Sequence, residues 1–206
     1  MTERTVAVVT AGLSQPSATR LLADRLAAAT EAALRDRDVT PRTEVVELRG
    51  HAHELTDNLL TGFPAPPLRA AIDTVAGADG LIAVTPVFTA SYSGLFKTFF
   101  DVLGKDTLVG APVLIAATAG TARHSLVLDH ALRPLFSYLR ALVVPTGVFA
   151  AAEDWGAGGG ATSRALGERI ERAAGEFAPL VAAGRAGEPV DPFDNPTPFE
   201  DLLPGR

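Results

Sequence analysis

The sequence predicts an α/β fold in which a five-stranded parallel sheet is covered by helices on both faces. Short apolar runs alternate along the chain with longer segments whose apolar residues recur at helical spacing, as expected for strands joined by crossover helices. The runs contain few polar residues, which is typical of parallel strands buried on both faces. The chain has 206 residues, of which 47% are hydrophobic, and this suits a single domain with a substantial core.

The first half of the chain supplies three strands and two helices. Strands are expected at residues 6–9, 44–48 and 80–85, and the second of these has the weakest pattern. A short helix is expected at 66–77. A longer helix is expected at 17–36, where apolar side chains recur at helical spacing: Leu22, Leu26, Ala29 and Ala33.

The second half continues the same alternation. Strands are expected at 112–118 and 146–150, and helices at 92–104, 123–141 and 162–183. Each of these helices has an apolar face: Phe96, Phe99, Phe100 and Leu103 in the first, Leu128, Leu132, Leu135 and Leu139 in the second, and Leu166, Ile170, Ala173, Phe177 and Leu180 in the third. Five strands in this alternation favour the flavodoxin-like order 2-1-3-4-5 over a six-stranded dinucleotide-binding sheet.

Composition and charge exclude several classes of function. The net charge is −6 and no run of Lys or Arg occurs, so neither nucleic acid nor an anionic membrane is expected as a partner. The absence of cysteine excludes disulfides and thiolate catalysis, so electron transfer would need a bound cofactor. A membrane-spanning stretch and a signal-peptide pattern are both missing. We expect a cytoplasmic protein with one domain over residues 1–184 and a Pro-rich extended tail over 185–206.

Functional residues are expected in loops at the carboxyl edge of the sheet, because ligands of such sheets bind beyond the carboxyl ends of the strands. The first loop, residues 11–19, joins the first strand to the first helix. Gly12 permits a tight turn there, and a helix N-terminus favours anions. Three hydroxyl groups suit a phosphate: Ser14, Ser17 and Thr19. The alternative is that Ser17 simply caps the helix. The loop lacks G-K-[ST] and G-x-G-x-x-G, so neither a nucleoside triphosphate nor a dinucleotide is indicated.

The second loop, residues 85–94, follows the third strand. Pro86 is expected to end that strand. The backbone beyond it can then follow the edge of a planar ring, with Phe88 packed beside the ring. The alternative is an ordinary strand–helix connection capped by Ser91 or Ser93.

The third loop, residues 118–122, again places a glycine and hydroxyl groups at the carboxyl end of a strand. Each of the three loops is a weak signal alone. All three are expected at the same end of one sheet, and together they make a stronger case for a binding site.

The segments AGLSQPSAT, TPVFTASYSGLFKTFFD and ATAGTARHSLVLDHALRPLF together resemble the NADPH-dependent FMN reductases of two-component monooxygenase systems. The likeness covers roughly residues 5–150 and is greatest to the alkanesulfonate-type reductases and to those partnered with luciferase-like monooxygenases. It implies hydride transfer from NADPH or NADH to FMN, with reduced FMN passing to a flavin-dependent monooxygenase. It also implies a homodimer or homotetramer with helices 92–104 and 123–141 at subunit contacts.

The resemblance places the FMN phosphate at the first loop, the isoalloxazine ring along the second, and a further ring contact at the third. Phe88 stands where many relatives carry Tyr. No side chain is expected to act as a catalytic acid or base, because the flavin performs the chemistry. The candidate FMN-binding residues are Gly12, Ser14, Pro16, Ser17, Ala18, Thr19, Pro86, Val87, Phe88, Thr89, Ser91, Thr118, Ala119 and Gly120.

Two alternative functions on the same fold stay open at this point: a non-enzymatic FMN electron carrier, and a quinone or azo reductase with permanently bound FMN. The choice between NADPH and NADH also stays open. His51 and His53 lie in an expected polar loop with too few further ligands for a metal site. His124 either reaches the flavin or nicotinamide or only begins a helix, and residues 153–155 form either a mobile flap or an ordinary surface loop.

Pro134 interrupts a segment that otherwise has a continuous helical pattern. Because proline lacks an N–H, the carbonyl of residue 130 loses its usual partner, and the helix must kink or form a π-bulge. The resembling reductases carry an inserted aromatic residue in this helix, within stretches such as DYALKP or EHQLRP. The matching stretch here is DHALRP, which makes His130 the inserted residue. We expect His130 either at a subunit interface, where it aids FMN exchange, or packed within a kinked helix.

Overall fold

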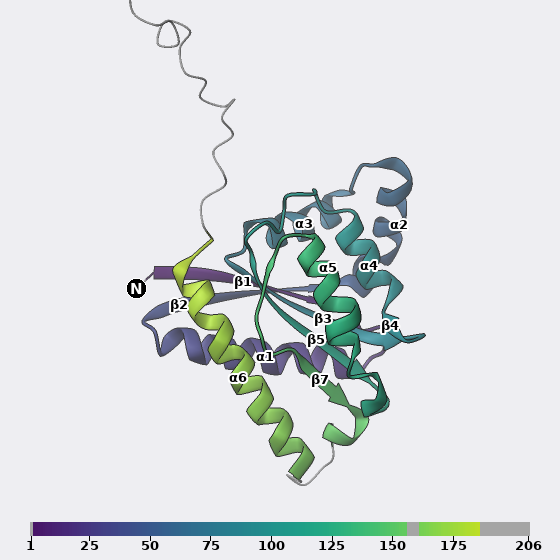
Figure 1. Cartoon of the computed structure of the whole chain (residues 1–206). Helices are drawn as coiled ribbons and strands as arrows, with labels where there is room; N and C mark the ends of the chain where they lie inside the picture. Colours follow the sequence, from purple (N-terminus) through teal and green to yellow (C-terminus); the bar gives the residue numbers. More distant parts are fainter. Residues whose placement is uncertain (1, 156–160, 186–206) are drawn as a thin grey trace, which may run out of the picture.

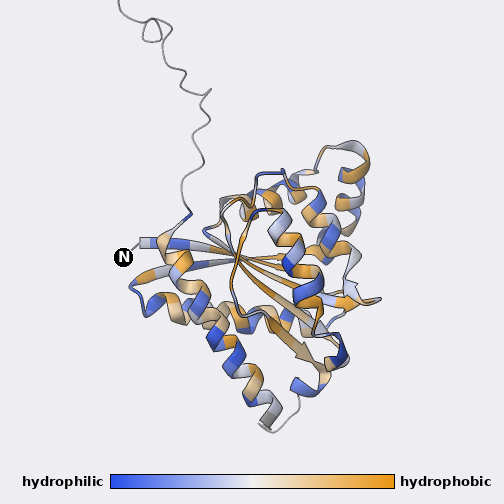
Figure 2. Ribbon diagram, viewed as in Figure 1, coloured by the Kyte–Doolittle hydropathy of each residue, from blue (hydrophilic) through white to orange (hydrophobic). Residues whose placement is uncertain are grey.

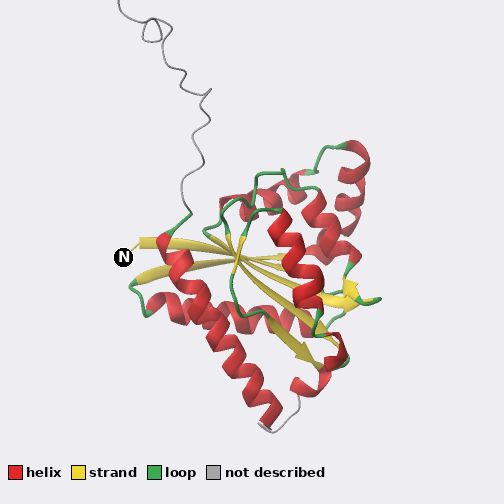
Figure 3. Ribbon diagram, viewed as in Figure 1, coloured by secondary structure: helices red, strands yellow, loops and turns green. Residues whose placement is uncertain are grey.

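The computed structural model describes residues 2–155 and 161–185, in which a central sheet lies between two layers of helices (Figures 1 and 3). The strands are β1 Thr2–Thr10, β2 Val39–Glu47, β3 Gly80–Phe88, β4 Ser91–Tyr92, β5 Pro112–Ala119, β6 Leu142–Val143 and β7 Val148–Ala151. The α-helices are α1 Ala18–Arg35, α2 Ala52–Thr61, α3 Pro66–Gly77, α4 Gly94–Asp101, α5 Arg133–Tyr138 and α6 Ala161–Ala183. Short helical turns occupy Leu48–His51 (η1), Ala122–His124 (η2), Leu128–Leu132 (η3) and Ala152–Trp155 (η4).

The sheet follows the path β2-β1-β3-β5-β6, with β7 also paired to β5 and β4 paired to β3. All these pairings are parallel except the one between β3 and β4. The five longer strands lie in the order β2, β1, β3, β5 and β7. Counted along the chain among themselves, this is the order 2-1-3-4-5, which confirms the predicted flavodoxin-like arrangement. The described sheet has seven strands rather than five, because the two-residue strands β4 and β6 are too short to leave a sequence pattern.

Two hydrophobic clusters fill the space on either side of the sheet. One contains side chains from α2, α3, α4 and α5, including Leu68, Phe96 and Phe136. The other contains side chains from α1 and α6, including Leu22 and Phe177. Figure 2 shows the apolar residues of the strands and the inner helix faces gathered between the layers. The alternation of buried residues between the two clusters explains why β3 and β5 have continuous apolar sequences.

Residues 52–61 form the helix α2, which was not predicted from the sequence and which contains His53, a residue expected in a polar loop. Only Leu55 and Asn58 of this helix are buried. Its apolar stripe is therefore too narrow to be recognised as a helical pattern in the sequence. The helix ends at Gly62, whose φ of 78° is left-handed and whose N–H is donated to the carbonyl of Asn58.

The expected helix at 123–141 is divided into three pieces: η2, the π-helix η3 and α5. The π-helix ends at Leu132, two residues before Pro134, and contains His130. Of the two expected outcomes, a kink or a π-bulge, the structure has the π-bulge. The N–H of Arg133 is donated to the carbonyl of Leu128, five residues earlier. His130 is exposed in the single chain, so packing of its side chain inside a kinked helix is not observed.

Candidate functional site

A pocket opens at the carboxyl edge of the sheet, where the strands β1, β3, β5 and β7 end. Its volume is about 480 Å³, which is within the range of roughly 300–1,000 Å³ typical of small-molecule sites. The pocket is lined by Leu13, Ser14, Ala18, Thr19, Pro86, Val87, Phe88, Thr118, Ala119, Gly120, Ala152 and Trp155. All three predicted loops therefore contribute to one concave site.

Ser17 caps α1, as the alternative interpretation stated. Its Oγ accepts a hydrogen bond from the backbone N–H of Arg20 at 3.2 Å, and it does not line the pocket. Gly12 also lies outside the lining, and its φ is not left-handed. A Cβ at Gly12 would lie 2.1 Å from the Oγ of Ser17. The glycine is needed for close packing against the cap.

A buried pair of hydroxyl groups joins the first and third loops. The Oγ1 atoms of Thr19 and Thr118 are 2.8 Å apart, although the residues are 99 positions apart in the chain. Both residues are buried and both line the pocket. The two hydroxyls carry two protons and their mutual hydrogen bond uses one of them. The pair can therefore donate a second hydrogen bond to a ligand in the pocket.

The second loop is a β-hairpin, and Pro86 does not end the strand. β3 continues to Phe88 and pairs with β4, so that Phe88 faces Ser91 across the hairpin. The turn residues Thr89 and Ala90 have left-handed φ angles of 48° and 68°, as a two-residue hairpin with a type I′ turn requires. This geometry places Thr89 and Ser91 outside the pocket lining.

Thr85 fixes the base of this hairpin. Its fully buried Oγ1 donates to the carbonyl of Pro86 at 2.9 Å and accepts from the N–H of Ser93 at 3.0 Å. The Oγ of Ser93 accepts in turn from the N–H of Phe96 at 3.2 Å and caps α4. Ser93 rather than Ser91 is therefore the capping serine, and Thr85 holds the pocket wall against the start of α4.

A fourth wall comes from the segment after β7, which supplies Ala152 and Trp155. Asp154 anchors this turn, because its Oδ2 accepts from the N–H of Ala151 at 2.8 Å. The guanidinium of Arg25 lies 5.8 Å from the centre of the Trp155 ring, within the range of a cation–π contact. The flap expected at residues 153–155 would continue into residues 156–160, which lie outside the described residues.

Of the candidate residues, the structure brings together Ser14, Ala18, Thr19, Pro86, Val87, Phe88, Thr118, Ala119 and Gly120. It leaves out of the lining Gly12, Pro16, Ser17, Thr89 and Ser91. Leu13 and Ala152 were not among the predicted site residues, and Trp155 was named only within the alternative of a flap over the site. The sequence did contain a signal for Ala152 and Trp155, because they follow a strand that ends at the same edge of the sheet.

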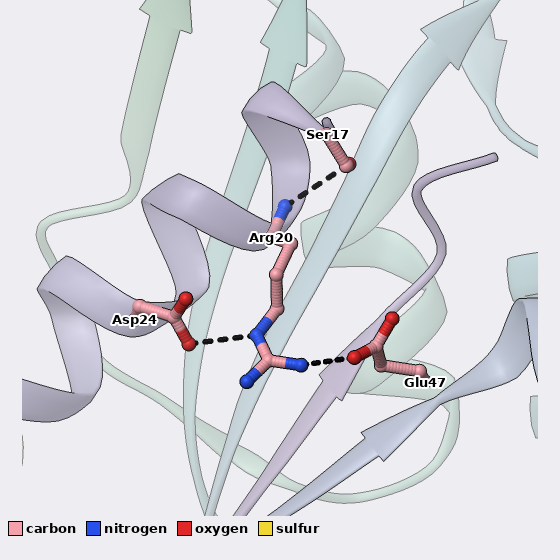
Figure 4. A network of polar contacts seen from close by, with 4 residues as sticks. All are labelled: Ser17, Arg20, Asp24 and Glu47. Atoms are coloured by element: carbon pink, nitrogen blue, oxygen red, sulfur yellow. Dashed lines mark hydrogen bonds and ion pairs between the residues drawn. The ribbon is translucent and has the colours of Figure 1, made fainter. Parts of the chain in front are cut away.

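A charged network lies beside the first loop (Figure 4). The Nε of Arg20 donates to Asp24 at 2.7 Å, and its Nη1 pairs with the carboxylate of Glu47. The hydrogen bond with Asp24 is the main cause that raises the pKa of the Arg20 guanidinium above its ordinary range. Two carboxylates therefore share one cation next to the pocket.

The histidines give no metal centre within residues 2–155 and 161–185, where groups of three or more metal-ligating side chains are absent. His51 is in η1 and contacts Glu54 at 2.7 Å, and His53 is in α2, so neither lies in the expected loop. His124 belongs to η2, is exposed and does not line the pocket. No helix in these same ranges is long and apolar enough to span a membrane.

Comparisons with known proteins point to one family. Residues 4–156 match the family described as NADPH-dependent FMN reductase. The NADH-dependent FMN reductase SfnE of Pseudomonas putida is 40% identical over 181 residues, which cover 88% of this chain and 94% of that protein. An FMN reductase (NADPH) of Pseudomonas aeruginosa is 39% identical over 85% of this chain and 91% of its own. The crystal structure of an oxidoreductase from Corynebacterium diphtheriae is 49% identical, has a TM-score of 0.85, and covers 89% of this chain and 99% of its own.

Proposed function

Because the chain belongs to the NADPH-dependent FMN reductase family, we propose that the pocket at the carboxyl edge of its sheet binds FMN and that the reduced FMN serves a separate flavin-dependent monooxygenase. The activity itself follows from the family and the relatives: the chain is an NAD(P)H-dependent FMN reductase. The observation that carries the assignment of the site is the convergence of three loops and the N-terminus of α1 on one pocket.

The residues of the pocket fit a ligand with a phosphate at one end and a flat apolar ring at the other. Ala18 and Thr19 are the first residues of α1 and line the pocket. Their backbone N–H groups have no partner within the helix and favour an anion. Beyond them the lining is mostly apolar, and the Thr19–Thr118 pair supplies one further donor. Both parts of FMN therefore find matching surfaces.

When bound, FMN supplies the redox chemistry and accepts a hydride from the nicotinamide. The protein holds and orients it. Ser14 and the start of α1 would hold the phosphate, and the hairpin wall from Pro86 to Phe88 and the end of β5 would contact the ring. Among the described residues that line the pocket, none has a side chain that titrates near neutral pH. This supports a mechanism without a side-chain acid or base.

The role in a two-component system is supported by the resemblance of the three loop segments to reductases of that kind. The rim of the pocket also remains accessible, with Leu13 and Phe88 exposed, which suits a flavin that enters and leaves. We further propose a cytoplasmic homodimer or homotetramer with α4 and the segment around η3 and α5 at the contacts. The strongly exposed Tyr138 supports the second contact. One curated relative is NADH-dependent and another uses NADPH, so both coenzymes are candidates.

Steady-state oxidation of NADPH and NADH, with and without added free FMN, tests this function. Turnover that requires added FMN is the expected result. Flavin that copurifies with the protein, together with turnover on quinones alone, would show a quinone reductase instead. An absence of NAD(P)H oxidation under all conditions would leave only the electron-carrier function. Comparing kcat/KM for the two coenzymes in the same assay decides the nucleotide preference.

A further inference from the structure

Arg20 follows the proposed phosphate-binding residues directly, yet its side chain is directed away from them. Its backbone N–H is bonded to Ser17 in the first turn of α1. The guanidinium is turned along the helix toward Asp24 and across to Glu47 (Figure 4). An arginine in this position would ordinarily be a natural partner for a phosphate group.

Glu47 lies at the edge of the sheet where the proposed phosphate site is found. It is the last residue of β2 and pairs in register with Thr10, the last residue of β1. The first loop begins at the next residue. With Asp24, the network holds two negative charges against one positive charge. Its net charge of −1 therefore lies beside the helix N-terminus that would receive the phosphate.

Fold stability gives little reason for this arrangement. All three side chains are more than a third exposed, and ion pairs of that kind contribute little to folding because solvent screens them. A cation in the first turn also opposes the helix dipole, while a carboxylate near that end is favoured by it. Glu47 therefore competes with a phosphate both for the guanidinium and for the positive end of the helix.

We propose that Glu47, with Asp24, holds Arg20 away from the first loop and so weakens the binding of the FMN phosphate, which makes FMN an exchangeable substrate rather than a retained cofactor. This inference rests on the proposed function, because it requires the phosphate at the N-terminus of α1. Under this proposal Glu47 sets the affinity for FMN and has no part in the hydride transfer at the ring.

The test is the variant Glu47→Gln, which removes the charge and keeps the shape. The dissociation constants of FMN and riboflavin are measured by flavin fluorescence quenching. Removing one negative charge beside the site proposed for a phosphate dianion should tighten FMN binding roughly three- to tenfold. Riboflavin has no phosphate, so its affinity should not change. Added salt should reduce the effect on FMN.

Glu44→Gln is the matched control. Glu44 lies on the same strand and also forms an exposed ion pair, in its case with Arg42 at 2.7 Å. Replacing Glu44 by Gln changes the net charge by the same amount as replacing Glu47. It is three residues, or about 10 Å, farther from the edge of the sheet. Its FMN affinity should equal that of the parent. In the opposite direction, Arg20→Gln leaves two carboxylates without their cation and should weaken FMN binding roughly three- to tenfold, again without an effect on riboflavin.

The outcomes separate the inference from the function on which it rests. If the parent binds FMN but Glu47→Gln does not tighten it, the inference is wrong and the proposed site stands. The inference also fails if riboflavin shifts as much as FMN, or if Glu44→Gln has the same effect as Glu47→Gln. A parent protein that binds no FMN at all overturns the proposed function itself.

Discussion

Replacement by alanine should have opposite effects at Gly12, which packs beside the pocket, and at Gly120, which lines it. A Cβ at Gly12 would lie 2.1 Å from the Oγ of Ser17, 3.2 Å from its Cβ and 3.1 Å from the Cβ of Thr19. A Cβ at Gly120 would have no heavy atom within 4 Å. Neither glycine has a left-handed φ, so backbone strain does not enter the comparison.

The cost of Gly12→Ala can be worked from these contacts. The clash must displace the Ser17 side chain and break its hydrogen bond to the N–H of Arg20. Loss of such a cap costs about 1 kcal/mol, and overpacking adds typically 1–3 kcal/mol. We expect a loss of about 2–4 kcal/mol in the free energy of unfolding, or roughly 5–15 °C in Tm for a domain of this size. Binding of FMN should weaken because the first loop must move.

A double-mutant cycle with Ser17→Ala isolates the clash. Ser17→Ala alone should cost about 1 kcal/mol by removing the cap. In Gly12→Ala/Ser17→Ala the 2.1 Å contact is gone and only contacts beyond 3 Å remain, so the double variant should cost less than the sum of the single changes. Thermal and denaturant unfolding, followed by circular dichroism, measure these values. Strictly additive costs, or a Gly12→Ala variant as stable as the parent, would refute the packing argument.

Gly120→Ala is the control for this reasoning and should leave the Tm unchanged. Gly120→Val should abolish FMN binding, because the valine side chain would enter the space proposed for the ring. Full FMN binding in the valine variant would place the flavin elsewhere. Thr19→Val and Thr118→Val should each cost about 1–3 kcal/mol by leaving the other hydroxyl buried without a partner, and their double variant should cost less than the sum, which unfolding experiments can check. Thr85→Val should raise the KM for FMN and lower the free energy of unfolding by about 1–3 kcal/mol, because the buried N–H of Ser93 loses its acceptor. Thr85→Ser keeps the hydroxyl and should restore both values. A serine variant as impaired as the valine variant would exclude the hydroxyl as the cause. His130→Ala should shift the oligomer distribution in light scattering or raise the FMN content of the purified protein, and parental values for both would remove the π-helix from flavin exchange.

The inner strands β3 and β5 could be predicted from the sequence because burial on both faces removes polar residues from them. β3 and β5 are buried along nearly their whole length, so their boundaries were close to the expected ones. β2 lies at one edge of the sheet, and most of its residues are exposed or partly buried. An apolar-run criterion therefore found the carboxyl-terminal part of β2 and missed its beginning at Val39.

The hairpin wall of the pocket could not be predicted because its turn lacks the usual signal. Two-residue hairpins are recognised by Asn-Gly, Asp-Gly or Gly-Gly at the positions with positive φ. Here these positions are Thr89 and Ala90. What holds the hairpin is tertiary: the buried Oγ1 of Thr85 reaches the N–H of Ser93, eight residues later. No local sequence rule expresses that contact, so Pro86 was wrongly expected to end the strand.

Hydroxyl groups illustrate the limit of reading ligand contacts from residue types. Ser14, Ser17 and Thr19 are equivalent in the sequence as possible phosphate donors, but the fold uses them differently. The Oγ of Ser17 accepts the capping hydrogen bond of α1 and lies outside the pocket lining. The Oγ1 of Thr19 is hydrogen-bonded to that of Thr118, whose position near it depends on the pairing of distant strands. Ser14 is exposed at the pocket. It follows that the pocket lining offers a phosphate three kinds of donor: the backbone N–H groups at the start of α1, the hydroxyl of Ser14 and the one spare proton of the Thr19–Thr118 pair. With so few donors in the lining, the charge of the neighbouring Arg20 network has a correspondingly large influence on how tightly FMN is held.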